Sequence, residues 1–162
     1  MMGGDAGDHR STRLWVCFIR SKPPRKRSER ALMHLIRVCG RWSIDHVAVG
    51  DDELMVDPRF GGAETHPARG FIRHQPGLTH LFHMQAPRRP ALESVVLGRP
   101  NRALPTILRW LTRGRVPTTD CVAVATAMLR SAGVEVPRRI VTPRQLNRWL
   151  LESDAELIQI EP

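Results

Sequence analysis

The sequence predicts an α+β domain in which helices pack beside a mainly antiparallel sheet of about five strands. Short runs of β-branched, aromatic and aliphatic residues stand between turn residues in the first half of the chain. Segments with helical spacing and cap signals concentrate in the second half. No internal repeat or linker divides the 162 residues, a length that fits one domain.

The elements of the first half follow from apolar runs and their flanking residues. A polar, glycine-rich stretch at 1–12 is expected to be a disordered tail, and 13–162 to form the single domain. Apolar runs bounded by turn residues predict strands, and Ser28 can cap a helix that Gly40 ends. The expected elements are a strand at 14–20, a helix at 28–38, strands at 46–50 and 53–57, a polar loop at 58–70, and strands at 70–74 and 78–85.

Helix caps and stops organise the second half. Gly114 and Gly133 each end a run with helical spacing, and Thr142 followed by Pro143 is a helix-start signal. The expected elements are a short strand at 94–97, helices at 102–113, 121–133 and 143–151, and a closing strand at 156–160.

The composition is strongly basic, with 25 Lys and Arg against 16 Asp and Glu and a formal net charge of +9. All basic residues except Lys22 and Lys26 are arginine, which is typical of a GC-rich genome. The alternative interpretation is an anionic partner such as nucleic acid. Because the arginines are dispersed along the chain, we expect any nucleic-acid binding to be weak and non-specific.

Targeting signals are also absent from the sequence pattern. No apolar run approaches the ~20 residues of a membrane-spanning helix, and the first residues lack the pattern of a secretory signal. Three cysteines (Cys17, Cys39 and Cys121) exclude a disulfide-rich scaffold and favour a reducing compartment. We therefore expect no membrane span and a chain that is cytoplasmic when synthesised.

Cys121 is the residue most indicative of chemistry. Thr118, Thr119 and Asp120 directly precede it, and each can cap the helix that follows. Cys121 then lies in the first helical turn, where free backbone N–H groups and the helix dipole favour a thiolate. A small buried hydrophobic residue is the alternative interpretation of this cysteine.

His46 begins the first strand of the predicted hairpin. With Asp51 and Asp52 as the two turn residues, His46 faces Asp57 on the next strand. Directly opposed residues have Cβ atoms about 4.5–5.5 Å apart, so an aspartate there can orient the imidazole and leave one ring nitrogen for a nucleophile. A bulged three-residue loop would break this register. With Cys121, these residues form the set that a thiol nucleophile with an oriented base requires.

The order and spacing of these motifs resemble a known family. Residues 45–49 (DHVAV) are similar to the histidine strand of the permuted NlpC-type papain-like hydrolases, a group that includes YiiX-like amidases and lecithin:retinol acyltransferase. The family's helix pattern C-x-x-x-v-x-x-x-L-x-x-x-G is matched by residues 121–133, and its later t-P-x-x-L by residues 142–146. The resemblance covers about residues 42–151. It implies a permuted papain-like fold, in which a mainly antiparallel sheet packs against a central cysteine-bearing helix.

The resemblance also implies the roles of the site residues. Cys121 would be the nucleophile, His46 the general base, and Asp57 the residue that orients the base. The third polar residue varies in such folds, so Glu64 or His66 in the following loop is the alternative for that place. The family often has a neutral residue just before the cysteine, whereas this chain has an aspartate, whose charge would oppose a thiolate.

The function that the resemblance implies is cleavage of an amide or ester through a cysteine thioester. The implied substrate is a peptidoglycan peptide or an acylated protein or lipid. A phage virion or tail that carries the chain among other virion proteins is the setting that we consider for such a hydrolase. Two other functions stay open: a catalytically inactive virion or tail component with the same fold, and a basic nucleic-acid-binding module.

No metal and no cofactor are expected. His80 and His83 would point to opposite faces of a strand, because strand side chains alternate. Cysteine pairs at zinc-finger spacing are absent from the sequence.

Overall fold

The structure is a computed structural model that describes residues 11–22, 27–40, 44–59, 62–91, 103–113, 115 and 120–158. Six strands of this part of the chain form one antiparallel sheet, in the order β4-β3-β2-β1-β5-β6. The strands are β1 (Thr12–Ile19), β2 (His46–Asp51), β3 (Leu54–Arg59), β4 (Gly62–Pro67), β5 (Leu78–Ala86) and β6 (Glu156–Ile158). The predicted α+β class and antiparallel sheet are confirmed, with six strands in place of about five.

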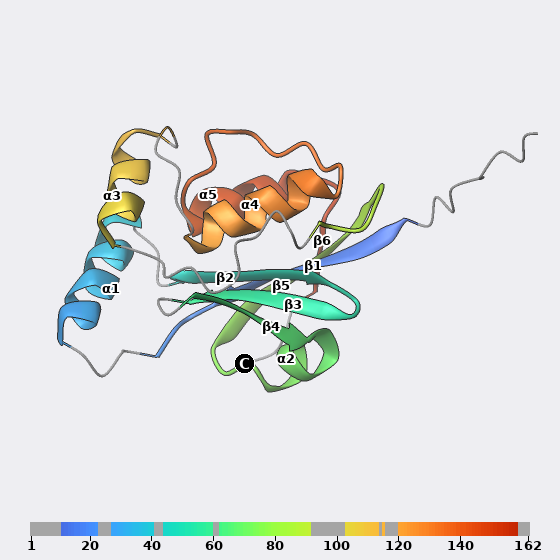
Figure 1. The fold of residues 1–162 in the computed structure, drawn as a ribbon, viewed down its shortest axis with the longest axis horizontal. Helices are drawn as coiled ribbons and strands as arrows, with labels where there is room; N and C mark the ends of the chain where they lie inside the picture. The colour runs from blue at the N-terminus through green and yellow to red at the C-terminus, as the bar shows by residue number, and fades with distance from the viewer. Residues whose placement is uncertain are drawn as a thin grey trace, which may run out of the picture.

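The helices lie on both sides of the sheet and beyond one end of it (Figure 1). They are α1 (Arg27–Gly40), α2 (Ala68–His74), α3 (Ala103–Leu111), α4 (Cys121–Ser131) and α5 (Pro143–Leu151). In Figure 1, α4 and α5 cover one face, α2 lies on the opposite face, and α1 and α3 stand at the end of the sheet. This arrangement brings α3 next to the N-terminus of α4.

Alternating residues of the central strand β1 divide the core into two layers. Leu14, Val16 and Phe18 belong to the layer that includes α4 and α5, and each is at most 1% exposed. Cys17 and Ile19 belong to the opposite layer, together with residues of α2. Burial of a side chain as large as Phe18 stabilises the folded state by about 1.5–3 kcal/mol. The sheet therefore holds α4 and the strand residues near it in fixed relative positions.

The polar loop predicted at 58–70 is wrong over most of its length, because β4 and the start of α2 occupy residues 62–70. β4 pairs with β3 and lies at the edge of the sheet. Its side chains are mostly polar, so the sequence carries no alternation of apolar residues. An edge strand is instead held by backbone hydrogen bonds to its single neighbour, which a side-chain pattern does not reveal.

The strand predicted at 70–74 is also wrong, because these residues belong to helix α2. The adjacent apolar residues Phe71 and Ile72 suggested a strand. Phe71 instead lies three residues after Ala68, so the two share one helical face, and both are buried against the sheet. Tertiary packing of this pair decides the helix.

Two expectations fall outside the described residues. These are the strand at 94–97 and nearly all of the tail at 1–12, although β1 already begins at Thr12. The other predicted helices and strands are present, with ends within a few residues of those expected. Helix α5 begins with a complete capping box, in which Thr142 and Gln145 each accept a backbone hydrogen bond from the other end of the motif.

The hairpin of β2 and β3 has a different register from the predicted one. Gly50 pairs with Met55, which places the turn one residue later than expected. The carboxylate of Asp51 fixes this turn, because its Oδ1 accepts hydrogen bonds from the backbone N–H groups of Glu53 and Leu54, both at 2.8 Å. The predicted turn is therefore wrong by one residue.

Candidate active site

Cys121 is the first residue of α4 and is half-buried. Asp120 is the N-cap of the helix, and its Oδ1 accepts a hydrogen bond of 2.9 Å from the backbone N–H of Ala123. The helix follows from the cap and from a run of small apolar residues that pack into the core. The position in the first helical turn is the predicted one, and it gives the thiol both free N–H groups and access to solvent.

His46 and Asp57 are in direct contact on neighbouring strands. His46 Nε2 lies 2.5 Å from Asp57 Oδ1, and the side chain of Asp57 is fully buried. The observed register places them as diagonal neighbours, whereas the prediction had them directly opposed. The shift changes the pairing by two positions, so both side chains keep the same face of the sheet. The predicted contact is therefore present although the predicted register is wrong.

The imidazole of His46 also interacts with Cys121. Burial disfavours the charged ring, but hydrogen bonds to Asp57 and Cys121, together with the negative charges of these groups, raise the pKa of His46 from 6.5 to about 9. Since Nε2 is bonded to Asp57, Nδ1 is the ring nitrogen left for the thiol. The structure thus brings together all three residues that the sequence singled out.

Asp57 stays ionised although it is buried. Burial raises the pKa of this carboxyl, but the hydrogen bonds and charges of His46 and Arg59 outweigh burial and lower it below its ordinary value. Arg59 Nε lies 2.5 Å from Asp57 Oδ2, and its side chain is 53% exposed. An ionised carboxylate at this place favours the imidazolium form of His46.

Glu64 and His66, the alternatives for the third residue, lie on β4 beside Asp57. Glu64 pairs with Asp57 across the strands, and its side chain is 62% exposed. His66 Nε2 lies 3.9 Å from Asp57 Oδ2 and 3.6 Å from Glu64 Oε2, and its ring stacks on Phe71. Asp57 is the residue that bonds the His46 imidazole. Glu64 and His66 instead lie beside Asp57 on the neighbouring strand.

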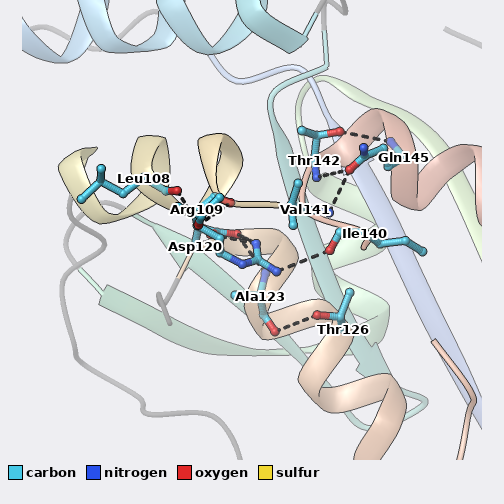
Figure 2. A network of polar contacts seen from close by, with 10 residues as sticks. Leu108, Arg109, Asp120, Ala123, Thr126, Ile140, Val141, Thr142 and Gln145 are labelled. Atoms are coloured by element: carbon cyan, nitrogen blue, oxygen red, sulfur yellow. Dashed lines mark hydrogen bonds and ion pairs between the residues drawn. The ribbon is translucent and has the colours of Figure 1, made fainter. Parts of the chain in front are cut away.

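Arg109 was not anticipated from the sequence. It lies on α3 and forms a buried ion pair with Asp120, with distances of 3.0 and 3.1 Å from Nη1 to the two carboxylate oxygens (Figure 2). No local pattern links an arginine eleven positions before an N-cap to that cap. The pair is visible only once α3 is placed beside α4.

The described residues give no sign of other common site types. No group of three or more His, Cys, Asp or Glu within them could hold a metal ion. None of the helices described is both long and apolar enough to cross a membrane. Comparisons of the chain with protein-family models, with curated proteins and with solved structures return no match.

Proposed function

We propose that this protein is a cysteine hydrolase with a permuted papain-like, NlpC-type fold. One observation carries the proposal: the imidazole of His46 bonds the buried carboxylate of Asp57 and also interacts with the thiol of Cys121. A nucleophile, a base and a residue that orients the base are the parts that nucleophilic catalysis by a thiol requires.

The architecture supports the proposed fold. The cysteine lies at the N-terminus of a core helix packed against an antiparallel sheet, and the histidine lies on a strand of that sheet. The motifs that resemble the NlpC-type family fall on the corresponding elements, namely β2, α4 and the start of α5. The resemblance and the geometry thus both support these residues as the proposed site.

The electrostatics support a reactive thiol. With its pKa near 9, His46 is protonated at neutral pH, and an imidazolium beside a thiol favours the thiolate. Asp57 balances that positive charge and holds the ring. The proposed reactive form of the site is therefore a thiolate–imidazolium pair.

The proposed reaction has two steps. The Cys121 thiolate attacks the carbonyl carbon of an amide or ester, the bond to the leaving group breaks, and the His46 imidazolium gives its proton to the leaving amine or alkoxide. The Cys121 backbone N–H stabilises the oxyanion. Water then attacks the thioester while His46 takes its proton, and the acid leaves with the thiol restored. A peptidoglycan peptide or an acylated protein or lipid is the substrate class that the resemblance supports.

The test uses p-nitrophenyl acetate, whose acyl group can form a thioester on any active thiol. The wild type, Cys121→Ser and His46→Ala are compared, with His66→Ala as a matched histidine control. We expect a burst of p-nitrophenolate and an acetylated Cys121 peptide from the wild type. We expect neither from Cys121→Ser, a strongly slowed burst from His46→Ala, and a nearly normal one from His66→Ala. A wild type that forms no acyl adduct, or a His46→Ala variant that reacts at the wild-type rate, would refute the proposal in favour of an inactive component with this fold.

A further inference from the structure

The ion pair of Arg109 and Asp120 is buried directly beside the proposed nucleophile. Arg109 is 7% exposed and Asp120 is 3% exposed. Besides its contacts with Asp120, the guanidinium donates a hydrogen bond from Nη2 to the backbone carbonyl of Ile140 at 3.4 Å (Figure 2). Arg109 therefore ties α3 to the cap of α4 and to the segment that leads into α5.

Asp120 has two roles that conflict unless its charge is balanced. Its carboxylate caps α4 through the backbone N–H of Ala123, and the cap fixes the first turn that carries Cys121. The same carboxylate is the residue before the proposed nucleophile, and in a buried site an unpaired negative charge would repel a thiolate with little screening.

Among the described residues, further charges near this turn come from the sheet and from the later part of α4. His46 and Asp57 reach Cys121 from β2 and β3. Arg130 lies later in α4, and its pKa is lowered by burial and by the positive charges of Arg109 and Arg138. Arg109 contacts both oxygens of the Asp120 carboxylate, so this cation is placed to balance its charge.

We propose that Arg109 is a positioning residue for the Cys121 nucleophile, which holds and neutralises the Asp120 carboxylate so that this group caps α4 without repelling the thiolate. The inference rests on the proposed function only in naming Cys121 as the nucleophile. It adds a fourth residue, from α3, to the machinery that prepares the thiol.

The test follows iodoacetamide labelling of Cys121 against pH, by mass spectrometry of the full-length protein. Four proteins are compared: the wild type, Arg109→Met, Asp120→Asn and the double variant. Arg109→Met removes this cation from the buried carboxylate, so the pH midpoint of labelling rises by about one pH unit. Asp120→Asn keeps a good N-cap and leaves the cation unbalanced, so the midpoint falls. The double variant returns close to the wild-type midpoint, because both charges are gone.

Opposite shifts from the two single variants are the signature of charge balance. A purely structural tie between α3 and α4 predicts that both variants loosen the fold and move labelling in the same direction, and this result would overturn the proposal. Arg109→Lys keeps the positive charge, so it should hold the midpoint near the wild-type value. Should Arg109→Met fail to fold, Asp120→Asn decides alone, since a midpoint equal to that of the wild type would refute the proposal. Labelling after His46→Ala tests the base separately, so failure of the proposed function and failure of this inference give different results.

Discussion

Replacing Asp57 with asparagine keeps the size of the side chain and removes its charge. Asp57 Oδ1 lies 2.5 Å from His46 Nε2, and the carboxylate is fully buried, so its charge acts on the imidazole with little screening. Loss of an opposite charge at this distance lowers a pKa by about 1–3. The pKa of His46 should therefore fall from about 9 to between about 6 and 8.

The loss of activity should greatly exceed the loss of stability. Formation of the thioester should slow by roughly 10²–10⁴-fold, the usual contribution of a well-placed general base, because the amide also permits the wrong tautomer of His46. The free energy of unfolding should fall by only about 1–3 kcal/mol. The two former partners of Asp57 tolerate its loss, because His46 can release its proton and Arg59 is 53% exposed to water.

Two assays measure this effect. NMR titration of the His46 ring gives its pKa, and the pH profile of the p-nitrophenyl acetate burst gives the consequence for the thiol. Glu64→Gln is the matched control, because Glu64 pairs with Asp57 across the strands but its side chain is 62% exposed. An identical pKa of His46 in the wild type and in Asp57→Asn would contradict this role of Asp57, as would an equal shift of that pKa in Glu64→Gln.

Three further outcomes follow from the same structure. Iodoacetamide near neutral pH should label Cys121 well before Cys17. Cys17 is fully buried, and its burial together with the charge of Asp57 raises its pKa to about 12. Mass spectrometry that finds Cys17 labelled first would contradict this. The folded-state pKa of His46, about 9, exceeds its ordinary value of 6.5, so its charged form contributes about 3 kcal/mol below pH 6.5. This contribution is lost as the pH rises through about 9, so chemical denaturation from pH 6 to 10 should show falling stability in the wild type and a flatter profile in Asp57→Asn. Gly50→Ala should destabilise the fold by about 1–3 kcal/mol, because a Cβ there would overlap the backbone carbonyl oxygen of Leu54. An unchanged thermal midpoint would refute this.

The sequence predicted the contact of His46 and Asp57 better than it predicted the register. The turn moved by one residue because the Asp51 carboxylate accepts two backbone hydrogen bonds, a side-chain preference that the two-residue turn rule does not include. A shift of one turn position changes the pairing by two, so the same side chains share a face and the contact survives. A bulge would have separated them.

Elements whose signals are local were predictable, and those decided by packing were not. The cap at Asp120 and the Thr142 capping box mark their helices in the sequence itself. Helix α2 is decided by burial of Phe71, and edge strand β4 by backbone pairing with β3. The role of Arg109 was not predictable either, because its contact with Asp120 exists only once α3 is packed beside the start of α4.

The position of β4 has a consequence for self-association. In the described part of the chain, β4 and the three-residue β6 are the edges of the open sheet, and an unpaired edge is a template for pairing with another chain. β4 carries Glu64 and His66 and ends at Pro67, which lacks a backbone donor. The charged and polar side chains that surround Asp57 therefore also discourage edge-to-edge pairing. The same short strand thus flanks the carboxylate that holds the imidazole and presents a polar edge that disfavours pairing with a neighbouring molecule.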